Sequence, residues 1–265
     1  MLRPMEQGSL RVQGLQVGDV MVHPKERGAF TRKGIFYQIT HPYLAEHIVE
    51  ADETRLPSGP KAVLGFGFPT IRHMILGEKL KFYKPSGAKI MQLAWAAEAA
   101  PRNPWWTVRL TEHDVSVADR LYSEMKASLP QYLIPVRNAQ WVNARFVDHP
   151  THHYVIFALR HRMTQRVAAL MVVRERADHL EWIDFVGGRE HIDLCLTSLR
   201  RHAHALGKAK VQTWLSSWVS DVFNLQSPVV EDTGIVVPTN SHPESAFSEQ
   251  LSTRLWLMTG DTDFR

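Results

Sequence analysis

The segment Gln16-Val-Gly-Asp-Val-Met-Val-His-Pro-Lys-Glu-Arg-Gly-Ala-Phe-Thr-Arg-Lys-Gly-Ile-Phe36 sets the architecture of the first part of this 265-residue chain. Its β-branched residues predict a strand over about 15–23, which ends at Pro24. A glycine-bearing basic loop follows, and beyond it the pattern predicts a helix over about 33–50. A strand joined to a helix through such a loop is typical of α/β proteins.

The loop carries Arg27, Gly28, Arg32, Lys33 and Gly34. A strand, a glycine-bearing basic loop and a helix together hold a phosphate against backbone N–H groups at the helix N-terminus. Glycine lets the backbone approach the anion, while arginine and lysine attract it. The loop is therefore a candidate phosphate-binding site. An ordinary strand-to-helix turn with a solvated basic rim is the alternative.

Composition narrows the class of protein. Hydrophobic residues make up 44% and charged residues 22%, which is typical of globular proteins and not of disordered ones. The length allows one large domain or two ordinary ones. The formal net charge of +4 allows an anionic small molecule but is too weak to indicate nucleic acid.

The lone cysteine, Cys195, excludes an internal disulfide and is consistent with a reducing compartment. It lies in an apolar-periodic stretch, so we expect a buried, inert thiol. No apolar run approaches the roughly 18 residues that span a bilayer, and no signal peptide is recognised. These features predict a cytoplasmic protein without a membrane span.

Small residues and prolines over 96–104 predict a boundary between a first unit, 1–97, and a second unit, 104–265. In the first unit we expect strands and helices to alternate over 15–23, 33–50, 61–68, 70–80 and 88–95. In the second unit the patterns predict strands over 105–110, 154–160, 167–174, 180–186 and 210–215, with two more centred on Ile235 and Trp256. Helices are expected there over 117–129, 138–146, from 187–188 to about 206, and 218–225.

The order of elements in the second unit resembles the GNAT superfamily of acyl-CoA N-acyltransferases. The first unit resembles the later portion of the same fold, beginning near its fourth strand. The resemblance implies an α/β fold with mixed sheets, built from two tandem GNAT-like units of which the first is partial. The stretch Asp184-Phe-Val-Gly-Gly-Arg-Glu-His-Ile192 lacks the family's full loop motif, so the second unit is expected to be degenerate and structural.

In that family the fourth strand ends in an Arg-x-x-Gly-x-Gly/Ala loop, whose backbone amides hold the pyrophosphate of CoA. Val22-His-Pro-Lys-Glu-Arg-Gly28 matches the approach to this loop, although Phe30 stands where the next glycine is expected. Lys33-Gly-Ile-Phe36 matches the continuation if residues 29–32 are an insertion. Gly65-Phe-Gly-Phe-Pro69 resembles the fifth strand that flanks CoA in many bacterial members.

The resemblance implies an acyl-CoA co-substrate, acetyl-CoA or another acyl-CoA. The residues expected to bind it are Met21, Val22, His23, Arg27, Gly28, Arg32, Lys33, Gly34, Ile35 and Thr70.

Amide formation also needs a base to deprotonate the amine and a group to polarise the thioester. Asp19 and His23 are the candidate catalytic residues; a solvated carboxylate and a surface histidine are the alternatives.

Four further acidic residues and the histidines also bear on the function. Glu181 and Asp184, three apart on a strand, are expected to point to opposite faces and cannot act as a paired acid and base without a bulge; one of them could face a cleft between the units. Asp261 and Asp263 could bind a cationic amine or form a capped chain end. The histidines lack the spacing of a zinc site, so no metal is expected.

The predicted function is transfer of an acyl group, most simply acetyl, from CoA directly to the amine of a small molecule or sugar in a bacterial-type protein. A homodimer is compatible with this prediction, and nucleic acid is not expected as a partner. Two alternatives stay open: a non-catalytic GNAT-like module that binds a ligand or partner, and an aminoacyltransferase that uses a charged tRNA.

Overall fold

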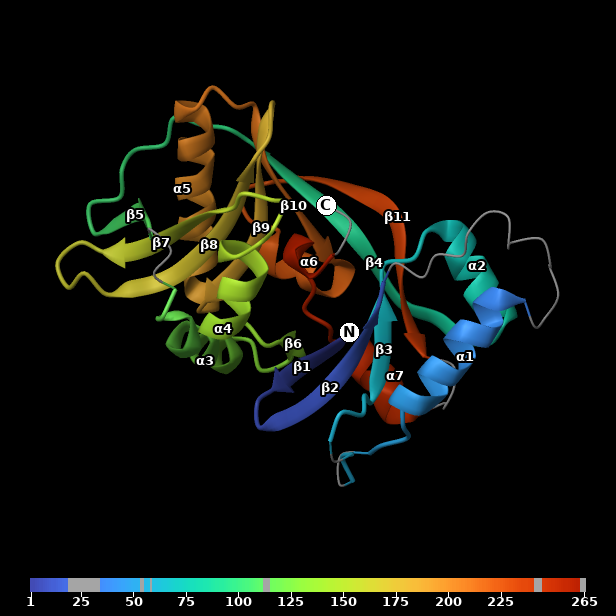
Figure 1. The fold of residues 1–265 in the computed structure, drawn as a ribbon. Helices are drawn as coiled ribbons and strands as arrows, with labels where there is room; N and C mark the ends of the chain where they lie inside the picture. The colour runs from blue at the N-terminus through green and yellow to red at the C-terminus, as the bar shows by residue number, and fades with distance from the viewer. Residues whose placement is uncertain (19–33, 53–54, 58, 112–114, 241–244, 263–265) are drawn as a thin grey trace.

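The computed structural model describes residues 1–18, 34–52, 55–57, 59–111, 115–240 and 245–262 (Figure 1). The strands are β1 (Leu2–Gln7), β2 (Leu10–Val17), β3 (Leu64–Gly67), β4 (Tyr83–Ala96), β5 (Trp106–Leu110), β6 (Ile134–Pro135), β7 (Val155–His161), β8 (Val167–Glu175), β9 (His179–Gly187), β10 (Lys210–Ser216) and β11 (Val229–Asn240). The α-helices are α1 (Ile35–His47), α2 (Ile71–Lys79), α3 (Ala118–Ser128), α4 (Ala139–Val142), α5 (Ile192–Ala205), α6 (Ser217–Phe223) and α7 (Ala246–Ser252). Short π- and 3₁₀-helical turns cover Asn143–Val147, Arg189–His191 and Thr259–Asp261.

The strands form two mixed sheets. The smaller sheet has the order β3-β2-β1-β6, and the larger has the order β11-β4-β10-β9-β8-β7-β5. Only two pairs of neighbours among these strands are parallel, β2 with β3 and β9 with β10. The predicted α/β class with mixed sheets is confirmed.

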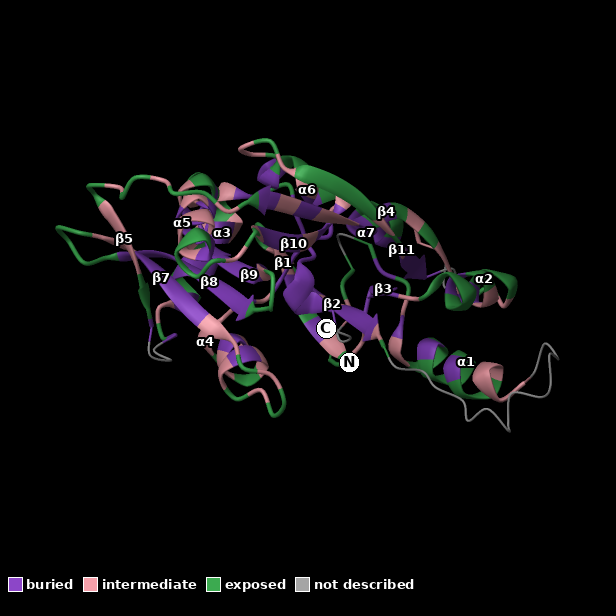
Figure 2. Ribbon diagram, turned by 90° about the horizontal axis from the view of Figure 1, so that it is seen from above, coloured by how far each residue is buried: buried purple, intermediate pink, exposed green. Residues whose placement is uncertain are grey.

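The larger sheet holds the main core. Strands β8 and β9 are buried along almost their whole length (Figure 2). Helix α3 packs on β8 and β9, and α5 packs on β9 and β10. Trp95, Trp182 and Trp256 are buried in this core, where their large apolar surfaces contribute strongly to stability.

A second core joins the smaller sheet to the rest of the molecule. Met5 and Phe66 from the smaller sheet pack with Ile90 of β4 and with Leu255, close to the end of the described chain. The larger sheet contains β4 from residues 1–97, and the smaller sheet contains β6 from residues 104–265. Strands from both sides of the predicted boundary therefore share each sheet; the division into two units stays a prediction.

Two expectations about local structure need correction. A β-hairpin of β1 and β2 that the sequence patterns did not predict precedes α1. Strand β2 covers Leu10–Val17, so it starts and ends earlier than the strand predicted over about 15–23. The strand predicted around Trp256 is wrong, because after α7 the chain makes only single bridges, Leu255 with Leu133 and Met258 with Leu215. Its apolar residues fill space between elements instead of pairing along a strand.

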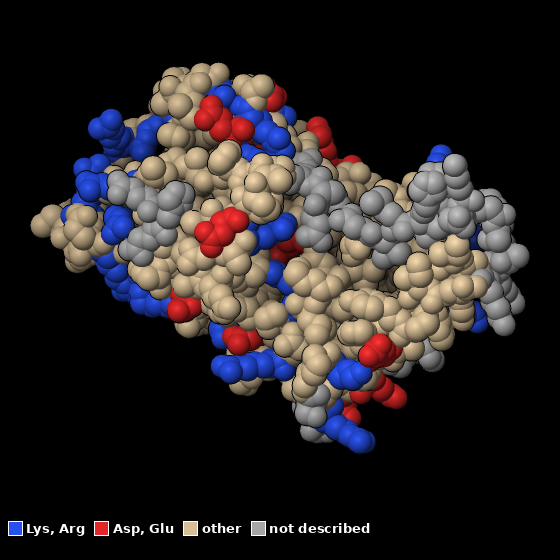
Figure 3. Space-filling view, viewed as in Figure 1, with Lys and Arg blue, Asp and Glu red and all other residues tan. Residues whose placement is uncertain are grey.

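Charge is distributed unevenly over the surface. In Figure 3 arginine and lysine side chains gather at the edge formed by β5 and β7, the end of the molecule opposite α1 and α2. Arg109 and Arg162 lie at this edge. Among the described residues no helix is both long and apolar enough to cross a membrane.

Candidate functional site

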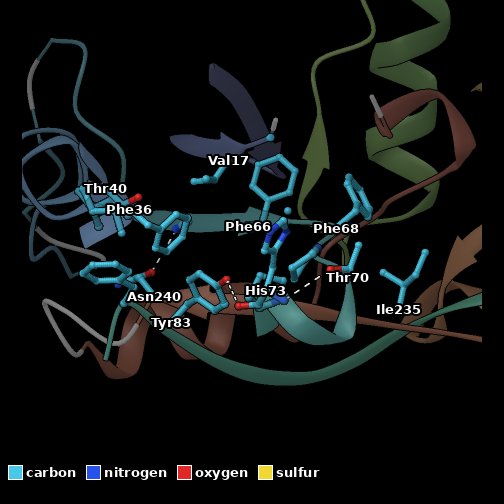
Figure 4. A pocket seen from close by; sticks show the side chains of 18 residues that line it. Val17, Phe36, Thr40, Phe66, Phe68, Thr70, His73, Tyr83, Ile235 and Asn240 are labelled. Carbon is cyan, nitrogen blue, oxygen red and sulfur yellow. Dashed lines mark hydrogen bonds between the residues drawn. The ribbon is translucent and has the colours of Figure 1, made fainter. Parts of the chain in front are cut away.

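A pocket of about 380 Å³ lies where the parallel strands β2 and β3 end (Figure 4). Pairing stops at Val17 and Gly67, and both residues line the pocket together with Gly18 and Pro69. Helices α1 and α2, strand β4 and strand β11 supply the remaining walls. In open α/β sheets, ligands bind at the carboxyl ends of parallel strands, so this is the expected place for a site.

Glycines on β3 allow close packing beside the pocket. A Cβ on Gly67 would come within 2.5 Å of the carbonyl oxygen of Val17, which only glycine avoids. A Cβ on Gly65 would meet the side chain of Ile48 at 3.0 Å, so this glycine lets the end of α1 pack closely on the strand. Alternate glycines therefore let β3 pack closely against both β2 and the α1 segment.

Helix α1 presents one stripe of side chains to the pocket. Phe36, Thr40, Leu44 and Ile48 follow one another at intervals of four residues, which places them on one helical face. Ile48 is the C-cap residue of the helix. Phe36 is half-buried, whereas Leu44 and Ile48 are almost completely buried, so the stripe runs from an open mouth to a closed end.

Helix α2 closes the opposite side. Thr70 caps its N-terminus, since the threonine hydroxyl accepts a hydrogen bond from the N–H of His73 at 3.4 Å. The Tyr83 hydroxyl donates to the carbonyl oxygen of His73 at 2.6 Å. Burial, with a smaller contribution from Glu78, raises the pKa of Tyr83 to about 12, so its phenol stays protonated at neutral pH.

Few polar groups face the pocket, and none of the described lining residues is Asp, Glu, Lys or Arg. Asn240 accepts a hydrogen bond from the N–H of Gly65 at 3.1 Å and is held in place by it. The hydroxyl of Thr40 is buried and has no hydrogen-bond partner among the described residues. A buried hydroxyl without a partner is costly, so it is a candidate for contact with a ligand.

Three of the predicted cofactor-binding residues are described. Gly34 is the N-cap residue of α1, Ile35 begins that helix, and Thr70 lines the pocket. The other predicted binding and catalytic residues, Asp19, Met21, Val22, His23, Arg27, Gly28, Arg32 and Lys33, lie outside the described residues. Their roles stay predictions.

Several lining residues are not predicted from the sequence, among them Thr40, His73, Tyr83 and Asn240. One signal was available, because Phe36, Thr40 and Leu44 already show the four-residue spacing of a buried helix face. Nothing in the sequence shows that Asn240 reaches Gly65 across 175 residues.

The space at the end of the second parallel strand pair, β9 with β10, is occupied by another segment of the chain. These strands pair only from Lys210 to Gln212, and the segment from 255 to 262 lies against the ends that follow. The N–H of Ser216 donates to the carbonyl of Leu257 at 3.0 Å, and that of Trp214 donates to the hydroxyl of Thr259 at 2.9 Å. That the second unit is degenerate and structural stays a prediction.

The acidic residues of the second unit are held in buried ion pairs. A bulge at Ile183 sets Glu181 opposite Arg174 and Asp184 opposite Val172, so both carboxylates lie on one face and not on opposite faces as predicted. Both are fully buried and neither faces a cleft. Glu181 pairs with Arg174 and Arg176, and Asp184 pairs with Arg137.

Asp261 is likewise unavailable to a substrate amine. Its carboxylate pairs with Arg3 at 3.1 Å and with Arg137 at 2.6 Å, and it is almost completely buried. Asp261 therefore holds a chain end in place, which is the alternative that the sequence left open; Asp263 lies outside the described residues. Within the described ranges no group of three or more His, Cys, Asp or Glu side chains could hold a metal ion.

Solved structures with the same arrangement are N-acyltransferase folds. The chain superposes on a probable N-acyltransferase of unknown function from Enterococcus faecalis with a TM-score of 0.59, at 10% identity over 90% of this chain. It superposes on GCN5-related N-acetyltransferases from Kribbella flavida and Anabaena variabilis with a TM-score of 0.58 each, at 14% and 15% identity over 89% and 90% of this chain. The fold is that of the GCN5-related N-acetyltransferases.

The match covers only part of these neighbours. The chain spans 57%, 54% and 58% of the three structures, a little over half of their length. No protein-family model matches the sequence, and no curated protein matches it. At such low identity the likeness establishes the fold alone.

Proposed function

We propose that this protein is an acyl-CoA-dependent N-acyltransferase that binds the acyl thioester in the pocket at the ends of β2 and β3. The observation that carries the proposal is the position of this pocket. It lies at the carboxyl ends of a parallel strand pair, between the helices that follow each strand. The equivalent opening at β9 and β10 is filled by residues 255–262, which leaves one site of this kind among the described residues.

The phosphates of CoA would lie outside the pocket, at the N-terminus of α1. That helix has no acidic residue in its first turn, and no described side chain caps its N–H groups. Such N–H groups favour an anion. The basic residues Arg27, Arg32 and Lys33 lie within the seven residues before Gly34 in the sequence, and we propose them as phosphate ligands.

In the proposed reaction, the nitrogen of a small-molecule or sugar amine attacks the thioester carbonyl. The new C–N bond forms, the C–S bond breaks, a base takes the proton from the amine, and the CoA thiolate leaves and is then protonated. Asp19 and His23 remain the proposed bases. Among the described lining residues, His73 is a third candidate, since its imidazole can accept a proton from an amine.

Transfer through a cysteine is excluded from the proposal, because Cys195 is fully buried on α5 within the main core. Direct transfer within a ternary complex is therefore the proposed mechanism. A cytoplasmic location and a homodimer remain parts of the proposal. A non-catalytic binding module is the second candidate, because no Asp or Glu is among the described residues that line the pocket.

The test is a thermal-shift titration with CoA and acyl-CoAs, followed by detection of free thiol with a panel of amines. A ligand at about 100 times its Kd contributes about 2.7 kcal/mol, which is a rise of about 5–10 °C for a chain of this size. The Arg27→Ala/Lys33→Ala variant should lose this rise. Binding without turnover would support the binding module, and no shift with any CoA species would contradict the acyltransferase and leave the binding module.

A further inference from the structure

We propose that the pocket accepts the hydrocarbon chain of a medium-length fatty acyl thioester in preference to acetyl. The inference rests on the proposed function, because it names the acyl group that the same site would take. It depends on the length of the pocket, on the chemistry of its closed end and on its volume.

The pocket follows α1 for most of the length of that helix. From Phe36 to Ile48 the lining stripe covers 12 steps along the chain, which is roughly 18 Å at the rise of an α-helix. The half-buried end at Phe36 lies next to the helix N-terminus, where the CoA phosphates are proposed to bind. A ligand that enters there would point its acyl end toward Leu44 and Ile48.

The closed end is apolar. Leu44 and Ile48 line it, and each is at least nine-tenths buried. Phe82, which is equally buried, lies against Phe36 nearer the mouth. Such a surface binds methylene groups, and the Asn240 amide beside it already accepts a hydrogen bond from the N–H of Gly65. Thr40, one turn nearer the mouth, carries a buried hydroxyl without a partner among the described residues, placed to donate to a carbonyl oxygen of the ligand.

The volume exceeds what a two-carbon group needs. An apolar cavity of about 150 Å³ takes one benzene ring. The present pocket, at about 380 Å³, is more than twice as large. It therefore has room for roughly fifteen non-hydrogen atoms, which leaves roughly eight carbons for an acyl chain beside the sulfur and its neighbouring amide group. With acetyl the apolar closed end would stay empty.

The experiment is calorimetric titration of the purified protein with CoA and with acetyl-, butyryl-, hexanoyl-, octanoyl- and decanoyl-CoA below their micellar concentrations. Each methylene that enters the closed end should tighten binding about fourfold, so hexanoyl-CoA should bind at least tenfold more tightly than acetyl-CoA. The gain should stop once the pocket is full.

Two variants locate the effect. Leu44→Trp fills the closed end and should lower the octanoyl-to-acetyl affinity ratio at least tenfold; Ile48→Phe is a smaller change for the same purpose. Ile39→Trp is the matched control, because Ile39 is 55% exposed on another face of α1. It should leave the ratio unchanged.

Each result decides the inference. Equal affinity for acetyl- and octanoyl-CoA would overturn it while leaving the proposed function intact. A chain-length preference that survives both Leu44→Trp and Ile48→Phe would overturn it as well, since the chain would then bind elsewhere. Failure of every CoA species to bind would overturn the proposed function and the inference together.

Discussion

Nη2 of Arg137 lies 2.6 Å from Oδ2 of Asp261, although 124 residues separate them. The same guanidinium donates to both carboxylate oxygens of Asp184 and to the carbonyl of Pro135. Asp261 also accepts from Arg3 of β1. This buried cluster ties the first strand, β9 and the segment that fills the opening of β9 and β10 into one structure.

Removal of Arg137 should destabilise the fold strongly. Arg137→Met leaves two buried carboxylates without their main partner, and such a loss costs about 3–5 kcal/mol. Urea denaturation should show a free energy of unfolding lower by that amount. The control is Arg166→Met, whose partner Glu124 forms an exposed pair that contributes less than about 1 kcal/mol. Similar losses in both variants would contradict this account of the cluster.

Asn240 should be needed to hold β3 against β11. Asn240→Leu leaves the buried N–H of Gly65 without its acceptor, and an unsatisfied buried donor costs about 1–3 kcal/mol. Thermal unfolding should occur at a lower temperature, and ligand affinity should fall because both residues line the pocket. An unchanged unfolding temperature would mean that this hydrogen bond does not support the wall.

Thr40→Val should separate ligand contact from structure. The two side chains have similar shapes, and the change removes a buried hydroxyl that has no described partner. The free protein should be as stable as before or more stable by up to about 1 kcal/mol. Acyl-CoA should bind about fivefold to tenfold more weakly, as measured by calorimetry. A loss of stability together with unchanged affinity would show that the hydroxyl serves the fold.

Cys195 should report global unfolding. Burial raises the pKa of its thiol above the ordinary value, so the reactive thiolate is suppressed in the folded protein. A thiol reagent at pH 8 should therefore modify the native protein very slowly and the urea-unfolded protein at once. The protection should be lost over the same urea range in which tryptophan fluorescence changes. Rapid labelling of the native state would place Cys195 outside the core.

Most regular elements could be predicted because each carries its own pattern. Strands β7 to β10 show continuous β-branched or apolar runs, and α3 and α5 show helical periodicity closed by Pro130 and Gly207. The β1–β2 hairpin also has a sequence signal, because Gly8 lies between two segments in which apolar and polar residues alternate. In the structure Gly8 adopts a positive φ of 57° in the turn.

The pocket and the last segment depend on contacts that local patterns do not encode. Lining residues range from Val17 to Asn240 and come from both halves of the chain. The run around Trp256 has the composition of a strand, but the edges next to it allow only single bridges. The prediction that Glu181 and Asp184 point to opposite faces is wrong because of a bulge at Ile183. This bulge depends on the pairing of β9 with β8 and cannot be recognised in one strand alone.

Hydrogen exchange with and without octanoyl-CoA tests the central claim most directly, because it shows where on the chain the ligand acts. We expect slower exchange in α1, in β3 and in α2, the elements that line the pocket. Exchange in β9, β10 and residues 255–262 should not change, since that opening is already filled. Protection confined to β9 and β10, or absent everywhere at saturating ligand, would contradict the assignment of the acyl-CoA site.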